Sequence, residues 1–197
     1  INFSNENVLK FAKDFGGFNG DILCDKCSKE YINKGKEKYI SESRDLKKFL
    51  KSYCSTFPIV TTQNPQDWKY DTIEIVTAQA TMNNKVENKS FLDNLFGVNQ
   101  NIVDLDGSVN IGESICFNIL RQKAYLLGGN AILGVDIDYS EFGLKGELML
   151  VCMAGTAIKL QNLELLSNRY SKYKIKYDEL EDRFKLIKEH SNLDILK

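Results

Sequence analysis

The stretch from Leu127 to Ile158 reads LGGNAILGVDIDYSEFGLKGELMLVCMAGTAI and decides the fold. It opens on a glycine pair, which ends helices well because glycine adopts positive φ without steric cost. Two runs of alternating apolar and polar residues follow, Ala131–Tyr139 and Lys145–Met153, and such alternation is typical of half-buried β-strands. The stretch lacks the strand-to-helix order of a phosphate-binding loop, so we expect a structural corner followed by a hairpin.

The residues before this stretch predict the rest of an α+β core. Apolar side chains recur every three to five positions from Asn110 to Leu127, which predicts an amphipathic helix that ends at Gly128 and Gly129. Phe57–Thr62 is rich in β-branched residues and Tyr70–Ala80 alternates, so both are predicted strands. The segment Asn83–Asp106 is rich in Asn and Asp, and we expect a loop with one helical turn there. The core is thus predicted to hold four strands and one main helix.

The residues before the core are polar, lysine-rich and patterned as helices. One helix is predicted near Glu6–Phe15 and stops at Gly16 and Gly17. A second is predicted over Ser41–Tyr53, where Ser41 can serve as the N-cap. The chain therefore divides into three predicted zones: a helical region with a CxxC motif (1–56), the α+β core (57–160) and an amphipathic helix (161–197).

Composition limits the classes of partner. The 197 residues carry 26 Lys and Arg against 27 Asp and Glu, so the basic excess of nucleic-acid-binding proteins is absent and we expect no nucleic-acid partner. No apolar run reaches the roughly 18 residues of a membrane span. The five cysteines are an odd number, and Cys116 and Cys152 lie in apolar runs. This usage favours a reducing, cytoplasmic setting over a disulfide framework.

Three short motifs occur in the order found in a known family: Thr61-Thr62, the run Leu127–Ala131 with Gly134-Val135, and Gly155–Ile158. Through them, roughly residues 57–160 resemble the YbjQ-like family, small bacterial proteins described as heavy-metal-binding domains. The resemblance implies a β-α-β-β subunit of the dodecin-like or YbjQ-like type. It also implies a ring-forming homo-oligomer, commonly a pentamer. The polar segment Asn83–Asp106 replaces the family's glycine-rich centre, so a pocket formed by that loop is not carried over.

The motif residues are expected to act mainly in the fold. Asn130 tolerates unusual backbone conformations and can bond neighbouring backbone groups. The small residues from Ala154 to Ala157 indicate a close approach of another backbone. The alternative is that the motifs line a ligand site. The residues concerned are Thr61, Thr62, Gly128, Gly129, Asn130, Gly134, Gly155 and Thr156.

The pair Cys24-x-x-Cys27 has the spacing of half a zinc site. Structural zinc takes four thiolate or imidazole ligands, and the nearest further candidate is Cys54. A complete site would need Cys54 with a carboxylate, a second subunit, or residues upstream of Ile1. A redox pair at a helix start and two surface thiols without a ligand are the alternatives. The cofactor is therefore not assigned, and zinc is the metal that the spacing suits.

The other candidate side chains are interpreted as structural. Asp136 and Asp138 alternate with apolar residues, as on the solvent face of a half-buried strand. Asp104 and Asp106 lie in a DLDG turn that lacks the remaining ligands of a calcium loop. His190 is the single histidine, so neither a Ser-His-Asp nor a plausible Cys-His arrangement is available. No catalytic residue is assigned, and an enzyme with a site between subunits stays an alternative.

The last zone carries a coiled-coil-like stripe at heptad spacing. In a parallel self-pair Arg169 would face Lys174, and such repulsion disfavours an autonomous coiled coil. We expect the helix to dock on its own core or a neighbouring subunit, with a coiled coil or a partner protein's acidic groove as alternatives. The predicted partner-binding residues are Leu163, Leu166, Tyr170, Tyr173, Tyr177, Leu180, Phe184 and Ile187.

These observations favour a non-enzymatic, ring-forming homo-oligomer that binds a small ligand, a metal or a protein partner. A metal-binding protein that uses Cys24 and Cys27 is the alternative function.

Overall fold

The computed structural model describes residues 6–83, 105–142 and 148–191. In this part of the chain it holds four α-helices and a three-stranded antiparallel sheet, so the fold is α+β, as predicted. Contacts divide the chain into two compact units, one of residues 1–53 with 172–197 and one of residues 54–171. The first and last predicted zones thus contribute to the same unit. None of the described helices has the length and apolar character needed to cross a membrane.

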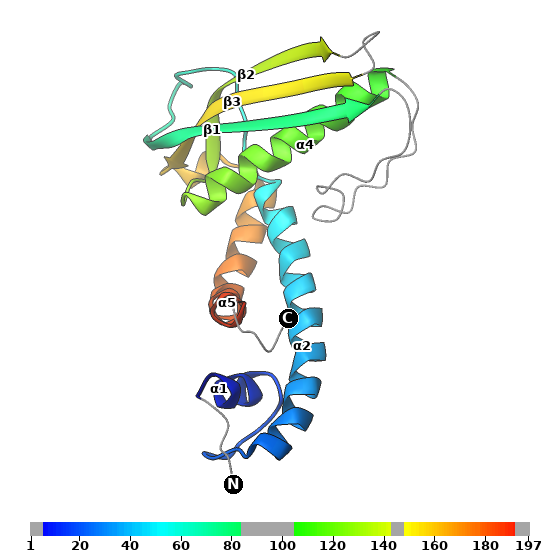
Figure 1. Ribbon diagram of the computed structural model, residues 1–197. Helices are drawn as coiled ribbons and strands as arrows, with labels where there is room; N and C mark the ends of the chain where they lie inside the picture. Colours follow the sequence, from blue (N-terminus) through cyan, green and yellow to red (C-terminus); the bar gives the residue numbers. More distant parts are fainter. Residues whose placement is uncertain (1–5, 84–104, 143–147, 192–197) are drawn as a thin grey trace. The chain divides into compact units, whose positions relative to one another are not determined.

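The unit of residues 54–171 contains the sheet. Its elements follow the chain order β1 (Tyr70–Asn83), α4 (Leu105–Leu126), β2 (Ala131–Phe142) and β3 (Leu148–Leu160), which is the predicted β-α-β-β order. The spatial order is β1-β3-β2, so the last strand is central. Helix α4 lies across one face of the sheet (Figure 1). The predicted helix before the glycine pair is confirmed, and it begins earlier than expected, at Leu105.

The core of this unit lies between α4 and the sheet. Strand alternation directs Val76, Ala78 and Ala80 of β1 towards the helix, whose Leu120 and Cys116 are fully buried. Small residues keep the layers close, since a Cβ on Gly112 would lie 2.8 Å from Val151 Cγ2. Burial of one large apolar side chain contributes about 1.5–3 kcal/mol, so this interface is a major source of the unit's stability.

The prediction of a strand at Phe57–Thr62 is wrong. The segment makes an isolated parallel bridge, Ile59 with Ile132, although Val60 N–H donates to the Ile132 carbonyl at 3.0 Å. Pro58 has no backbone N–H, so it cannot donate a hydrogen bond to β2, and the ladder between this segment and β2 is shorter as a result. A β-bulge in β2 then shifts the register, with Gly134 at φ +59°. The segment therefore follows β2 as an extended chain without becoming a fourth strand.

The predicted strand Lys145–Met153 ends later than expected, because β3 continues to Leu160, while residues 145–147 lie outside the described part of the chain. The motif Gly155–Ile158 is thus part of the central strand. A Cβ on Gly155 would lie 2.7 Å from Ile132 Cγ2 and 2.8 Å from Val135 Cγ2, so side chains of β2 fill the place of a side chain there. Of the predicted loop Asn83–Asp106, residues 84–104 lie outside the described part of the chain.

The unit of residues 1–53 and 172–197 is helical. The predicted first helix is confirmed as α1 (Glu6–Asp14). The second is longer than predicted, since α2 covers Asp25–Cys54, and Ser41 therefore lies inside it and caps nothing. The helix continues through Gly35, where a Cβ would lie 2.8 Å from Phe11 Cε1, so the absence of a side chain lets α1 approach α2 closely. Helix-favouring Lys and Glu residues fill the rest of α2.

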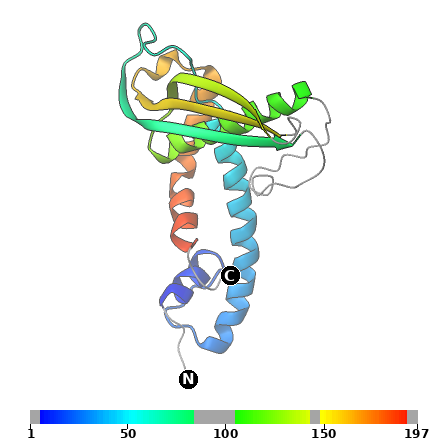
Figure 2. The same cartoon turned by 45° about the horizontal axis from the view of Figure 1, so that its top comes forward.

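The C-terminal heptad stripe is not one helix. A 3₁₀ turn covers Leu163–Leu165, and α5 begins only at Asn168 and ends at His190. Ser167 Oγ accepts the backbone N–H of Tyr170 at 3.2 Å, as an N-cap does, so the helix starts after Ser167. Leu166 instead packs beside the buried cluster at the end of β3. In Figures 1 and 2 the rest of α5 runs beside α2.

Candidate functional site

Cys24 and Cys27 lie at the start of α2. Ser28 donates its backbone N–H to the Cys24 carbonyl at 2.9 Å, and Cys27 donates its backbone N–H to Cys24 Sγ at 3.3 Å. The sulfur of Cys24 therefore takes the position of an N-cap acceptor. Cys24 is half-buried and Cys27 exposed, so both thiols are accessible.

The two thiols are electrostatically different. The pKa of Cys24 is lowered, first by a hydrogen bond from the Cys27 side chain and then by one from the Cys27 backbone. The pKa of Cys27 is raised, because its thiol donates to Cys24 and lies next to the negative charge that Cys24 can carry. The positive end of a long helix adds to the stabilisation of a thiolate at Cys24. Thiolates are the ligands that soft cations prefer.

Cys54 does not join this pair. It closes α2 at the opposite end, and 30 helical residues at 1.5 Å each span about 45 Å. Burial raises the pKa of its thiol to about 12, although the positive charge of Arg121 acts in the opposite direction. The described residues contain no group of three or more His, Cys, Asp or Glu side chains placed to hold a metal.

His190 and the acidic candidates are also apart from the cysteine pair. His190 is buried, its Nε2 lies 2.7 Å from Asp14 Oδ2, and its ring packs against the rings of Phe11 and Phe15, each with a centroid 5.5 Å away. Asp136 and Asp138 are exposed on β2. Asp104 lies outside the described residues, and the predicted turn at Asp106 is wrong because Asp106 lies in the first turn of α4.

Cys116 and Cys152 lie on packed elements of the second unit. Cys116 is buried in the core and its Sγ donates to the Val151 carbonyl at 3.5 Å. Burial raises the pKa of its thiol to about 11. Cys152 is half-buried, and its side chain points to the opposite face of β3 from its neighbour Val151. Both cysteines are free thiols.

The Gly-Gly-Asn corner forms a structural joint between α4, β2 and β3. Gly128 has φ +85°, and Gly129 donates its N–H to the Ala124 carbonyl at 2.7 Å, which closes the helix. The side chain of Asn130 is buried and binds both backbone groups of Leu160. Its Oδ1 accepts the Leu160 N–H at 2.7 Å and its Nδ2 donates to the Leu160 carbonyl at 3.2 Å. Asn130 thus continues the pairing of β3 on its β2 side, where the ladder ends at the pair Ala131–Ile158.

The remaining motif residues contact the same sheet. The Thr62 carbonyl accepts the N–H of Gly134 at 3.3 Å, while the side chain of Thr61 is exposed. Thr156 is half-buried and paired in register with Leu133. At Gly155 the side chains of Ile132 and Val135 of β2 occupy the space that a side chain would need. These contacts are with neighbouring backbone and core side chains.

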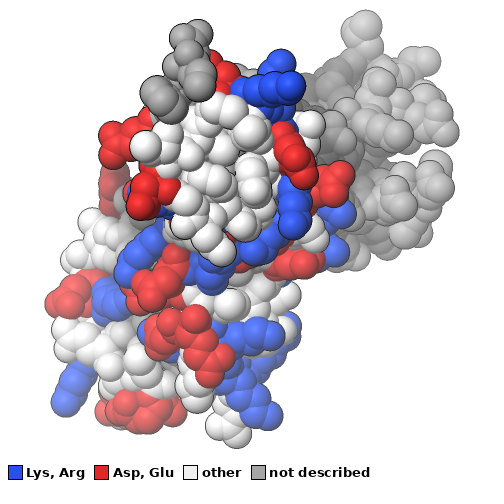
Figure 3. Space-filling model, turned by 90° about the horizontal axis from the view of Figure 1, so that it is seen from below, with Lys and Arg blue, Asp and Glu red and all other residues white. Residues whose placement is uncertain are grey.

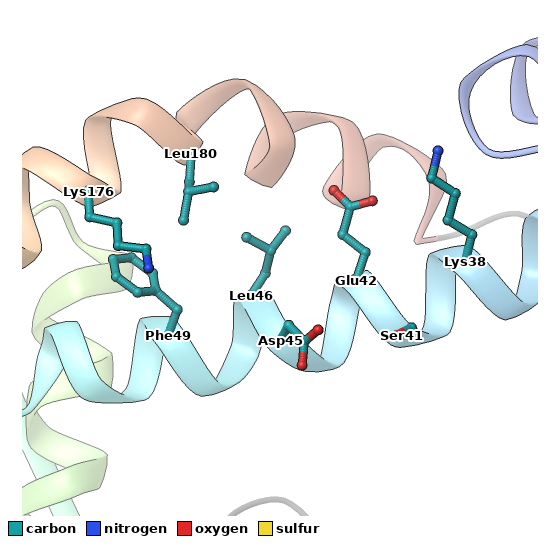
Figure 4. A pocket seen from close by; sticks show the side chains of 8 residues that line it. All are labelled: Lys38, Ser41, Glu42, Asp45, Leu46, Phe49, Lys176 and Leu180. Carbon is teal, nitrogen blue, oxygen red and sulfur yellow. The ribbon is translucent and has the colours of Figure 1, made fainter.

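A shallow hollow lies between α2 and α5 (Figure 4). Leu46 and Leu180 point towards one another across it, and Lys176 Nζ lies 5.7 Å above the ring of Phe49. Its volume is ≈ 550 Å³, and its other lining residues are Lys38, Ser41, Glu42 and Asp45. A second hollow of ≈ 370 Å³ shares Phe49 and Lys176, and it is lined further by Lys48, Ser52, Lys172 and Tyr173.

The predicted partner-binding stripe is divided between the two units. Tyr173 and Tyr177 contact α2, with ring centroids 5.7 Å from Phe49 and 5.0 Å from Tyr53. Tyr170 is buried in the other unit, 6.2 Å from the ring of Phe57. The remaining positions lie on α5, where Leu180 lines the hollow, Phe184 stacks on Tyr177, and the Ile187 carbonyl accepts a hydrogen bond from Tyr39.

Comparison with known proteins identifies the family. The family model described as "Putative heavy-metal-binding" (YbjQ) matches residues 57–161, more than half of the chain. The chain belongs to the YbjQ family. A UPF0145 protein of Clostridium kluyveri is 40% identical over 42 residues, which are 21% of this chain and 40% of that relative's length. A solved structure from Pediococcus pentosaceus, a DUF74 family protein of unknown function, has a TM-score of 0.35 and 19% identity, over 52% of this chain and 96% of that one.

The YbjQ segment contains the sheet, α4 and the Gly-Gly-Asn corner. Cys24, Cys27 and the hollow between α2 and α5 lie outside it. They therefore belong to the regions that flank the YbjQ segment in this chain. On the face drawn in Figure 3, basic and acidic side chains are interspersed around an uncharged area, and neither sign dominates.

Two features of the flanking unit were not predicted from the sequence. The guanidinium of Arg183 binds both carboxylate oxygens of Glu42, and it lies 5.6 Å above the ring of Phe15. The second is the pairing of His190 with Asp14. Both join residues more than 140 positions apart, and no local spacing predicts such pairs. Gly35, inside a lysine-rich helical run, was the available signal for close packing in this unit.

Proposed function

We propose that this YbjQ-family chain is a non-enzymatic subunit of a homo-oligomer, which its family resemblance makes a ring, commonly of five subunits, acting in the cytoplasm. The observation that carries the proposal is the edge of β1. In the described sheet β1 pairs only with β3, which leaves its other edge open. Edge strands of monomeric proteins are usually protected by lysine, proline or shortness, because an open edge recruits further strands.

Strand β1 lacks these three protections, and its pairing with β3 has one irregularity, a register shift between Thr72 and Glu74. It is 14 residues long and contains neither lysine nor proline. Ile75 is 71% exposed although it lies in the middle of a strand. An open edge next to an exposed β-branched side chain is the surface that a second copy of the chain would cover. The bound ligand, a small molecule, metal or protein, would then lie on or between the subunits.

The oligomer proposal predicts that Ile75→Lys lowers the assembly state. Size-exclusion chromatography with light scattering should give a multiple of the subunit mass for the unmodified chain and a smaller mass for the variant. Ile175→Lys is the matched control, because Ile175 is 64% exposed on α5. This control should keep the full assembly. A monomeric unmodified chain at micromolar concentration would refute the proposal.

Metal binding by Cys24 and Cys27 is the second candidate function. It is favoured by one observation, the two accessible sulfurs one helical turn apart. Two thiolates bind a thiophilic cation such as zinc, and the remaining positions would be filled by a second subunit or by solvent.

This second proposal predicts that the double variant Cys24→Ser/Cys27→Ser loses bound metal. Protein purified under reducing conditions and loaded with zinc should retain the metal through desalting, and the variant should fall to background by elemental analysis. Cys152→Ser, which changes one half-buried thiol elsewhere, is the control and should retain the metal. Equal zinc contents in the unmodified chain and the double variant would exclude this site.

A further inference from the structure

Cys24 and Cys27 lie three residues apart at the start of α2, with the Cys27 backbone nitrogen 3.3 Å from Cys24 Sγ. Residues three apart on a helix have Cβ atoms roughly 5–6 Å apart, and a disulfide needs about 3.5–4.5 Å. Cys24 directly precedes the first helical residue, and its sulfur accepts the backbone N–H of Cys27 at 3.3 Å. A small movement of the residues before α2 would therefore bring the two Cβ atoms within the disulfide range. That movement would break one helical hydrogen bond, from the Ser28 N–H to the Cys24 carbonyl.

The two cysteines also differ in their surroundings, so that each suits a different step of thiol–disulfide exchange. Cys24 accepts hydrogen bonds at its sulfur and lies at the positive end of a 30-residue helix, so it carries the thiolate more readily. Cys27 is the more exposed thiol. A thiolate is the attacking species in disulfide exchange, so Cys24 is suited to the first attack and Cys27 to the second.

We propose that Cys24 and Cys27 are a dithiol–disulfide couple that exchanges electrons stoichiometrically with a disulfide, so that the chain itself changes redox state and catalyses nothing. The Cys24 thiolate attacks one sulfur of a substrate R–S–S–R′, forms the mixed disulfide Cys24–S–S–R, and releases R′S⁻. Cys27 then loses its proton to solvent, attacks Cys24 Sγ, forms the Cys24–Cys27 disulfide and releases RS⁻. Two electrons pass to the substrate, and its two thiolates take up two protons from solvent in place of those that the cysteines lose. A dithiol substrate reverses the reaction.

The other three cysteines are poor competitors for this chemistry. Cys54 and Cys116 are buried, with pKa values raised to about 12 and about 11, so they hold little thiolate near neutral pH. Cys152 is a half-buried free thiol on the sheet, and it forms no disulfide with another cysteine. The inference does not rest on the oligomer proposal. It uses the sulfurs of the proposed metal site, and metal-free conditions separate the two.

The test uses the full chain, freed of metal with EDTA and equilibrated with glutathione buffers of increasing disulfide fraction. After rapid alkylation, trypsin cleaves behind Lys26, between the two cysteines, so an internal disulfide appears in mass spectra as two joined peptides. We expect Cys24 and Cys27 to oxidise together. Cys27→Ser should accumulate glutathione on Cys24, because the second attack is missing. Cys24→Ser should slow the first step at least about tenfold.

Folding of each variant is checked by far-ultraviolet circular dichroism, and the alkylation rates of the unmodified chain give a measurement that needs no variant. Cys24 should alkylate several times faster than Cys27 at pH 7. Separate glutathione adducts on both cysteines at every buffer ratio, without the joined peptides, would overturn the proposal. If zinc binding persists while exchange fails, the metal site stands and the redox couple does not.

Discussion

Asn130→Ala is expected to lower the free energy of unfolding of the unit of residues 54–171 by about 3 kcal/mol. The substitution removes both hydrogen bonds from the Asn130 side chain to Leu160. Leu160 is 1% exposed, so water cannot replace the lost partners, and each unsatisfied buried group costs roughly 1–3 kcal/mol. The amide also lies 3.5 Å from the Tyr170 hydroxyl, so that contact is lost as well.

Urea unfolding followed by tryptophan fluorescence measures this effect. Trp68 is the single tryptophan, and it packs beside the buried cluster that contains Leu160. Its signal therefore reports on the unit that carries the substitution. Asn110→Ala is the matched control, because Asn110 is exposed on α4 and the change should stay within about 0.5 kcal/mol. Equal unfolding free energies for the two variants would contradict a structural role of Asn130.

Phe11→Ala is expected to cost the other unit about 3–5 kcal/mol, which is the usual range for a fully buried phenylalanine. Phe11 is fully buried, with ring centroids 5.3 Å from Phe15, 6.1 Å from Tyr39 and 5.5 Å from His190. These rings come from α1, α2 and α5 or lie directly beside them, so one side chain connects three helices. Small domains have only about 5–15 kcal/mol of stability, and this loss is a large part of it.

Thermal melting followed at 222 nm by circular dichroism should therefore show helix lost at a lower temperature in Phe11→Ala. The fluorescence transition of Trp68 should move much less, because Trp68 belongs to the other unit. Ile22→Ala serves as the control, since Ile22 is 70% exposed and the same kind of truncation removes little buried surface there. A Phe11→Ala melting curve that matches the control would show that the three helices do not depend on this ring.

Much of the fold follows from local patterns. The alternation in Tyr70–Ala80 and Ala131–Tyr139 predicts β1 and β2, because period two is a property of the strand itself. The glycine pair after a helical run predicts the end of α4, where Gly128 has the positive φ that glycine favours. The strand predicted at Phe57–Thr62 did not form, because its pairing depends on β2. The bulge at Gly134 belongs to β2 and to its register with β3, and the residues 57–62 do not reveal it.

The candidate site was predicted only in part. The spacing of Cys24 and Cys27 was visible in the sequence. Cys54 was a candidate ligand only because it is the next cysteine along the chain. The sequence patterns placed a helix start at Ser41, and the helix in fact begins at Asp25. That difference puts Cys24 at a helix N-terminus and Cys54 at the opposite end. A helix interior is stabilised by packing that a sequence window does not contain, here the contact of Gly35 with Phe11.

By itself, the sequence determined the main helix, the glycine corner and three of the four expected strands, because periodicity and turn residues are local properties of the chain. Its short motifs carried the resemblance to the YbjQ family, which implied the β-α-β-β order. Only the tertiary structure decided that Asn130 binds Leu160, that the heptad stripe is divided at Ser167, and that His190 pairs with Asp14 beside two phenylalanine rings. Two of these contacts join residues that are distant along the chain. The third, the cap at Ser167, interrupts a heptad pattern that continues unbroken in the sequence. Their energies depend on burial and partner geometry, which arise only when the whole chain has packed.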